Sequence, residues 1–247
     1  MTSYSVFAKY YDLLSSDIDY MSVSDYHFAL FLKYGNKGNK ALDLACGTGS
    51  LTTLYAKKGL KVIGIDKSEE MLTAAENKAF NNGQNIQFSA QDMTDFSLPG
   101  KTDVIFSSFD SISHLPCTKA LDLTFSRAAN TLNDGGLFIF DINTPYKNSV
   151  ILGNNTFVYD IDELYMVWQN SFSPSTKKVK LSLDFFVKQG DFYKKYSESF
   201  YESTFSVKQI KKYLNANDFE IIEMFDDFTH NKPHPASQRI TFICTCK

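Results

Sequence analysis

The most constraining feature of this sequence is the alternation, over residues 40–143, of short apolar runs with segments of helical periodicity. The apolar runs predict strands and the segments between them predict helices. We expect strands at residues 40–45, 61–66, 86–89, 103–107 and 136–142, and helices at residues 48–58, after a Ser68 N-cap and at residues 118–132. Residues 133–136, Asn-Asp-Gly-Gly, are predicted to form a turn that ends the last helix. Apolar strands separated by helices are typical of a parallel sheet covered on both faces, so the sequence predicts a doubly wound α/β fold.

The pattern changes between residues 156 and 203, where no helical period appears. Within residues 179–188 apolar and polar side chains alternate, with Phe186 as the exception, which is typical of a strand with one face in water. Gly190 and Asp191 then fit a two-residue hairpin connection to residues 192–201. We interpret residues 151–203 as an antiparallel β insert, and residues 1–150 and 204–247 as the α/β domain with an N-terminal helical lid. In its last part we expect a helix at residues 207–215, capped by Ser206, and strands at residues 219–225 and 239–245.

Charge and composition argue against several classes of partner. The 247 residues include 25 basic and 28 acidic side chains, a net charge of −3, and only Arg127 and Arg239 are arginines, so a nucleic-acid partner is not expected. The chain has no apolar run of about 18 residues, no apparent signal peptide and no Cys-x-x-Cys pair, so we expect a cytoplasmic protein with reduced thiols and no membrane partner. His230 and His234 are four residues apart, but prolines interrupt any helix there, and we expect no metal site.

The segment from Asp43 to Gly49, Asp-Leu-Ala-Cys-Gly-Thr-Gly, follows the first predicted strand and opens a helix. Gly47 and Gly49 allow a sharp turn and the close approach of a ligand to the backbone. Position 52 is Thr, so a dinucleotide-binding Gly-x-Gly-x-x-Gly motif is incomplete. Because the carboxylate of Asp43 would attract a cation and repel a pyrophosphate, the loop predicts a ligand with a positive charge and no phosphate.

Polar residues also end the next two predicted strands. Asp66 lies 17 residues after Gly49, where a carboxylate can accept both hydroxyls of a ribose. Gln91, Asp92 and Met93 supply polar and soft apolar groups suited to the edge and face of an adenine. The three strand ends together predict an adenosine with a cationic tail.

With these motifs the chain resembles the class I S-adenosylmethionine-dependent methyltransferases from about Tyr4 to Lys247, although Ala45 stands where many members have a third glycine. Two stretches resemble the small-molecule N-methyltransferases of the glycine/sarcosine and amino-sugar types. These are Phe7-Ala8-x-x-Tyr11-Asp12 with Tyr20, which resembles their N-terminal lid, and Ser111-Ile112-Ser113-His114-Leu115. The resemblance implies a seven-stranded, mostly parallel sheet of order 3-2-1-4-5-7-6 with the seventh strand antiparallel.

The resemblance also implies a cofactor, S-adenosyl-L-methionine, and a small-molecule methyl acceptor, at nitrogen rather than oxygen. His114 would accept the proton, and Tyr11 would hold the methyl donor or screen its charge. The residues expected to bind the cofactor are Tyr4, Tyr11, Tyr20, Asp43, Ala45, Cys46, Gly47, Thr48, Gly49, Asp66, Lys67, Met71, Gln91, Asp92, Met93, Ser107 and Ser108.

Other interpretations remain open at the level of sequence. A nicotinamide-dependent oxidoreductase would use a similar sheet, although Thr52 and Asp43 argue against it, and a binding module could hold the nucleoside without transferring anything. His114 could instead serve a structural role near Pro116, Asp92 could be a turn residue, and the tyrosines could be packing residues. The sequence predicts neither the acceptor nor the oligomeric state.

Overall fold

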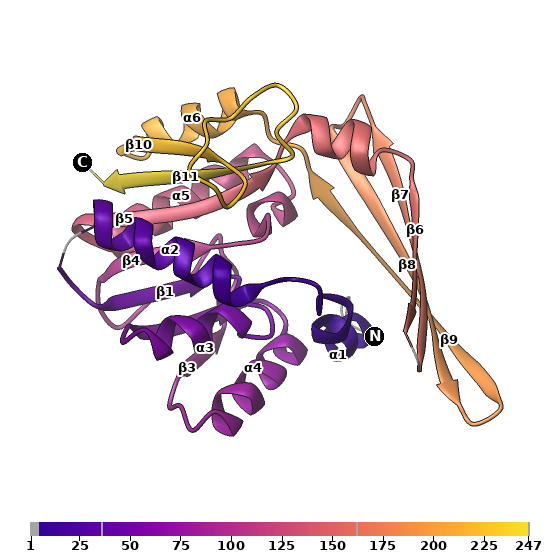
Figure 1. Cartoon of the computed structure of the whole chain (residues 1–247). Helices are drawn as coiled ribbons and strands as arrows, with labels where there is room; N and C mark the ends of the chain where they lie inside the picture. Colours follow the sequence, from indigo (N-terminus) through magenta and orange to yellow (C-terminus); the bar gives the residue numbers. More distant parts are fainter. Residues whose placement is uncertain (1–4, 36, 162, 247) are drawn as a thin grey trace.

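A seven-stranded sheet forms the centre of the molecule, and a four-stranded antiparallel sheet stands beside it (Figure 1). This computed structural model describes residues 5–35, 37–161 and 163–246. The strands of the large sheet are β1 (Lys40–Leu44), β2 (Lys61–Asp66), β3 (Gln87–Ala90), β4 (Thr102–Ser107), β5 (Leu132–Asn143), β10 (Phe219–Asp226) and β11 (Arg239–Cys246). Their order is β10-β11-β5-β4-β1-β2-β3, and β11 is antiparallel to both of its neighbours while the strands from β5 to β3 are parallel. The predicted fold class and strand order are confirmed.

Helices cover both faces of this sheet. α2 (Tyr20–Tyr34) and α3 (Ser50–Lys57) pack on one face, with α4 (Glu69–Asn81) beside α3, and α5 (Thr118–Thr131) and α6 (Val207–Ala216) pack on the other (Figure 1). Every residue of β4 is buried, because this central strand faces helices on both sides. The arrangement explains why the sequence shows continuous apolar runs there rather than alternation.

Two helix starts follow the predicted capping chemistry. The Ser68 side chain accepts a hydrogen bond from the Met71 backbone, and α4 begins at the next residue, Glu69. Ser206 forms a capping box with Gln209 at the start of α6. Both ends are set by neighbours within three residues, which is why the sequence predicts them.

The segment between α5 and β5 differs from the prediction. Residues 133–136 belong to β5, which begins at Leu132, so a separate turn outside the sheet is wrong. Thr102 pairs with Leu132 and Val104 with Leu137, so the extra residues of β5 form a bulge against β4. Gly135 has φ of +69° in this bulge. The Asn-Asp-Gly-Gly segment therefore follows the end of α5, as predicted, but it is part of β5 and not a separate turn.

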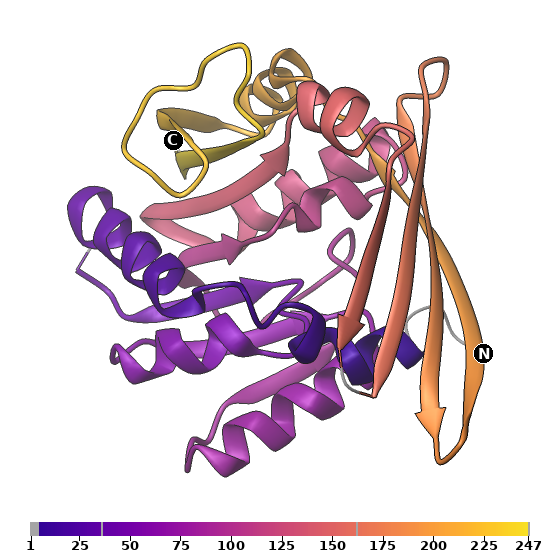
Figure 2. The ribbon, with the colours of Figure 1, turned by 45° about the vertical axis from the view of Figure 1, so that its right-hand side comes forward.

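The second sheet consists of β6 (Thr156–Ile161), β7 (Leu164–Ser173), β8 (Lys178–Gln189) and β9 (Phe192–Ser203), paired in that order. Gln189 pairs with Phe192, which confirms the hairpin at Gly190 and Asp191. A π-helical turn, Lys147–Leu152, connects β5 to this sheet. The remaining helix, α1 (Ser5–Leu14), lies between α4 and the antiparallel sheet (Figure 2). In the part of the chain that the structure describes, no helix combines the length and the apolar character needed to cross a bilayer.

Candidate active site

A cavity of about 1280 Å³ lies at the carboxyl ends of the parallel strands, under α1 and the inner face of the antiparallel sheet. Its lining includes residues that follow β1, β2, β3, β4 and β5 and residues of β7, β8 and β9. This crevice at the strand ends is where open α/β sheets bind their ligands. The volume exceeds the roughly 300 to 1,000 Å³ of a pocket for one drug-sized ligand, so the cavity has room for two reactants.

The loop after β1 turns through three left-handed residues, Ala45, Gly47 and Gly49, with φ of +62°, +54° and +72°. A Cβ at Gly49 would lie 2.9 Å from the Cβ of Ala75, so glycine lets the loop pack closely on α4. A Cβ at Gly47 would meet nothing within 4 Å, and Gly47 lines the cavity, so its backbone is open to a ligand. Ala45 adopts a conformation that costs an L-residue roughly 1–2 kcal/mol, which explains why glycine suits this position.

Asp66, at the end of β2, holds the loop in place. Its Oδ2 accepts a hydrogen bond from the Gly47 N–H at 2.8 Å, and its Oδ1 accepts one from the Ser68 N–H at 2.9 Å. Burial raises the pKa of Asp66, and these backbone hydrogen bonds oppose that shift. Each carboxylate oxygen retains a further lone pair, so Asp66 can brace the loop and still accept hydrogen bonds from a ligand in the cavity.

Asp43, in β1, is only 3% exposed. The Thr52 hydroxyl donates a hydrogen bond to its Oδ2 at 2.5 Å. Burial raises the pKa of Asp43 to about 7; Asp66 adds to this shift and Thr52 opposes it. A cation in the cavity would favour the ionised form of this carboxyl group. The sequence treats Thr52 only as a missing glycine, whereas the structure makes it the hydrogen-bond partner of Asp43.

Gln91 and Asp92 line the cavity, and their side chains also form hydrogen bonds with neighbouring residues of the protein. Gln91 accepts a hydrogen bond from the Ser97 N–H at 2.8 Å, and Asp92 accepts one from Lys67 Nζ at 2.7 Å. Burial favours a higher pKa for Asp92, but hydrogen bonds from Lys67 and Thr94 outweigh it and lower the pKa to about 2. Asp92 thus closes a turn and presents a stable negative charge at the cavity.

Most of the other predicted cofactor residues also line the cavity. These are Tyr11, Tyr20, Ala45, Cys46, Thr48, Lys67, Met71, Met93 and Ser108. Burial raises the pKa of Tyr11, so its hydroxyl stays protonated. The structure places Gly49 and Ser107 outside the lining: Gly49 precedes α3 as its N-cap, and Ser107 is fully buried at the end of β4. Tyr4 lies outside the described residues.

α1 connects the glycine loop to the antiparallel sheet. The Thr48 hydroxyl donates to Asp12 Oδ1 at 2.6 Å, and Asp12 Oδ2 lies 2.8 Å from Lys78 Nζ on α4. At the other end, the Val6 N–H donates to Glu198 Oε1 on β9 at 2.7 Å. Phe7 packs between these links, with its ring centroid 6.0 Å from that of Phe200. The N-terminal helix therefore contacts both the glycine loop and the antiparallel sheet and forms part of the cavity wall.

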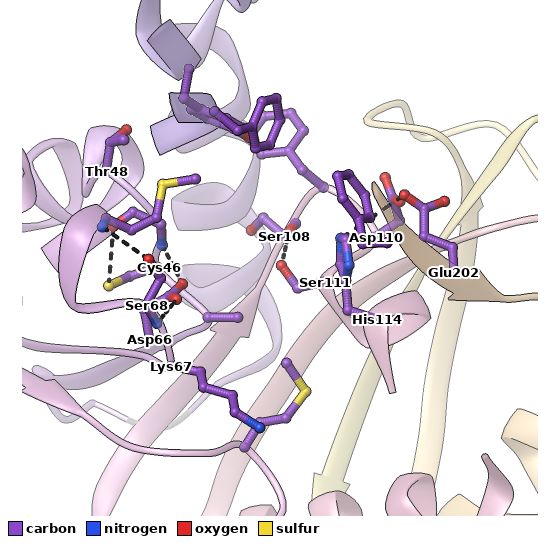
Figure 3. A pocket seen from close by; sticks show the side chains of 18 of the residues that line it. Cys46, Thr48, Asp66, Lys67, Ser68, Ser108, Asp110, Ser111, His114 and Glu202 are labelled. Atoms are coloured by element: carbon purple, nitrogen blue, oxygen red, sulfur yellow. Dashed lines mark hydrogen bonds and ion pairs between the residues drawn. The ribbon is translucent and has the colours of Figure 1, made fainter. Parts of the chain in front are cut away.

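His114 lies on the far side of the cavity from the glycine loop, at the end of a 3₁₀ turn, Ser111–His114 (Figure 3). Its Nε2 lies 4.0 Å from Glu202 Oε1, and its ring centroid lies 5.6 Å from that of Phe200. Burial lowers the pKa of His114, while Asp110 and Asp66 oppose the shift. The imidazole is therefore mainly neutral at pH 7, the form that can accept a proton.

A buried ionic cluster holds the backbone beside His114. Arg239 Nη1 pairs with Asp141, which is 1% exposed, and lies 3.2 Å from Asp110 Oδ1, while Arg239 Nε lies 3.3 Å from Asp227 Oδ1. Asp141 also accepts hydrogen bonds from the backbone N–H groups of Phe109 and Asp110, at 2.8 and 2.6 Å. These two residues have φ of +55° and +54°, so the cluster stabilises a strained loop after β4. Sequence reasoning missed this cluster. The feature of the sequence that could have pointed to it is Asp141, a carboxylate near the end of the fifth strand.

Comparisons with known proteins agree with this geometry. Residues 41–136 match the family described as "Methyltransferase domain". The chain is 31% identical over 243 residues to a candidate methyltransferase of Geobacillus sp. (strain WCH70), and the alignment covers 98% of both chains. It is 30% identical over 240 residues to YqeM of Bacillus subtilis (strain 168), which is also described as a candidate methyltransferase. That alignment covers 97% of this chain and 95% of YqeM.

Solved structures extend the comparison to the cofactor. The crystal structure of an S-adenosylmethionine-dependent methyltransferase from Clostridium acetobutylicum ATCC 824 is 35% identical in sequence and covers 98% of both chains with a TM-score of 0.89. Streptomyces venezuelae DesVI, at 21% identity, covers 97% of this chain and 98% of its own with a TM-score of 0.80, and shows that the fold is shared. The chain belongs to the S-adenosylmethionine-dependent methyltransferases and uses S-adenosylmethionine as its cofactor.

Proposed function

We propose that this methyltransferase acts on an amine nitrogen of a small molecule held between the glycine loop and the antiparallel sheet. The observation that carries the proposal is a single cavity with two unlike sides. Cys46, Thr48 and Asp66 lie on one side of it, and Asp110, His114 and Glu202 lie on the other (Figure 3). We assign the first side to the cofactor and the second to the acceptor, with residues 151–203 as the unit that covers the acceptor.

The residues on the cofactor side suit the groups of S-adenosylmethionine. Asp43 places a negative charge near the cationic tail, and Asp66 would accept the ribose hydroxyls. Gln91, Asp92 and Met93 would border the adenine. S-adenosylmethionine supplies a methyl group on a sulfonium, which releases the methyl and keeps the bonding pair when the acceptor nitrogen attacks.

The protein then has to orient the acceptor, exclude water and receive a proton. Orientation alone is worth up to roughly 7 to 11 kcal/mol in well-aligned reactions. The nitrogen of an amine needs only to lose one proton to become nucleophilic, and His114 would take that proton. An alcohol would need a stronger base to be activated, and for this reason we favour nitrogen over oxygen.

S-adenosylmethionine is expected to raise the melting temperature of the protein. At about 100 times its dissociation constant it adds about 2.7 kcal/mol to the free energy of unfolding, or roughly 5–11 °C for a chain of this size. Differential scanning fluorimetry measures the shift, with NADH at the same concentration as the control. A shift with NADH alone, or with neither compound, would contradict the assignment of the cofactor side.

Replacing His114 with alanine is expected to lower kcat by about 100-fold or more, because general-base catalysis contributes about 10²–10⁴. The Kd for S-adenosylmethionine should stay within about 2-fold. Since burial lowers the pKa of His114, wild-type kcat should fall only below about pH 6.5, and the variant should lack this dependence. The readout is initial rates against pH with an amine acceptor. Full activity of the variant would assign His114 a structural role.

A further inference from the structure

Glu202 has a buried carboxyl group at the cavity, and one oxygen of this group accepts no hydrogen bond from the described residues. It lies near the end of β9, is only 6% exposed and lines the cavity. Its Oε2 is buried and has no hydrogen-bond partner among the residues that the structure describes. An unsatisfied buried polar group costs roughly 1–3 kcal/mol, and more when it is charged. A ligand in the cavity that donates a hydrogen bond to Oε2 would remove this cost.

The groups that face Glu202 do not supply that partner. Arg239, on β11, is engaged by Asp110, Asp141 and Asp227. Lys147, in the π-helical turn, lowers the pKa of Glu202, but no ion pair joins these two side chains in the described structure. Burial is the largest influence on this carboxyl group and raises its pKa, and Asp110 adds to the shift.

The charges around this part of the cavity favour a cationic or hydrogen-bond-donating ligand. Asp110, Asp141 and Asp227 all contact Arg239 and offset its positive charge, although only Asp110 of the three lines the cavity. Oε1 of Glu202 lies 4.0 Å from His114 Nε2, so a group bound at Oε2 is next to the candidate proton acceptor. Glu202 and His114 lie on the same side of the cavity, opposite Asp66 (Figure 3).

We propose that Glu202 binds the amino group of the methyl acceptor through Oε2 and makes the site specific for amines over alcohols. The inference rests on the proposed function and adds the residue that selects the acceptor. A hydroxyl group can donate a hydrogen bond to this carboxylate but carries no charge, whereas an ammonium group donates a hydrogen bond and also places a positive charge opposite the negative one. His114, beside it, would take one proton from the bound ammonium group, which frees the nitrogen lone pair to attack the methyl group.

The test compares matched amines and alcohols on protein saturated with S-adenosylhomocysteine. Isothermal titration calorimetry at pH 8 would measure D-glucosamine against D-glucose, and ethanolamine against ethylene glycol. We expect one amine at least to bind about 10-fold or more tightly than its alcohol, the effect of one hydrogen bond to a charged group. Glu202→Gln should reduce that ratio to below about 3-fold, and Glu202→Asp should retain more of it because the carboxylate remains.

The control is Glu220→Gln, an exposed position on β10, which should leave the ratio unchanged. Equal binding of amine and alcohol by the wild type, the absence of any binding, or a ratio that survives Glu202→Gln would overturn the proposal. Binding of S-adenosylhomocysteine by each variant shows that the fold and the cofactor side are intact. If the wild type itself does not bind S-adenosylhomocysteine, it is the proposed function that fails.

Discussion

Replacing Asp66 with alanine is expected to weaken S-adenosylmethionine binding by well over 10-fold. A hydrogen bond to a charged group is worth about 1.5–3 kcal/mol, so the lost ribose contact alone corresponds to roughly 10- to 150-fold. The variant also removes the acceptor of the Gly47 and Ser68 N–H groups, which position the loop after β1. Both losses act on the cofactor side, so the total effect should exceed that of either one.

Isothermal titration calorimetry gives the affinity directly, and circular dichroism reports whether the variant is folded. Asp95→Ala is a matched control, because this carboxylate pairs with Arg127 at the surface and does not line the cavity. The control should bind S-adenosylmethionine as the wild type does. An Asp66→Ala protein with unaltered affinity would show that the ribose does not bind at the end of β2.

Replacing Arg239 with methionine is expected to destabilise the protein by about 3–5 kcal/mol, because it leaves Asp141 buried without its partner. The loss should lower the melting temperature by roughly 6–20 °C. Asp141 also holds the strained backbone at Phe109 and Asp110, so the loop that carries His114 should lose order as well. Urea denaturation measures the change in the free energy of unfolding.

The chain offers a direct control for this experiment, since it contains only two arginines. Arg127 pairs with Asp95 across side chains that are 46% and 76% exposed. Arg127→Met should therefore cost about 1 kcal/mol or less. The double variant Arg239→Met/Asp141→Asn should recover part of the loss, because it removes the unpaired charge. Equal destabilisation by the two single arginine variants would show that the buried cluster adds no more to the free energy of unfolding than a surface ion pair does.

Local features of this protein are readable from the sequence because their causes lie within a few residues. The Ser68 cap, the Ser206 capping box and the Gly190-Asp191 hairpin all depend on neighbouring side chains and backbone angles. The same holds for the alternation of apolar runs and helices, which requires a parallel sheet with two covered faces. The bulge at residues 133–136 escaped prediction because it depends on the register between β4 and β5.

The position of the glycine loop and of the acidic residues near the ends of the first three strands was determined by the sequence alone, because parallel strands bring their carboxyl ends to one edge. Only the tertiary structure decided what faces them. It joined Arg239 to Asp110 and Asp141, 129 and 98 residues away along the chain, and placed Glu202 of the antiparallel sheet beside His114. Such contacts depend on how two sheets and their connections pack, and no short-range pattern encodes that geometry.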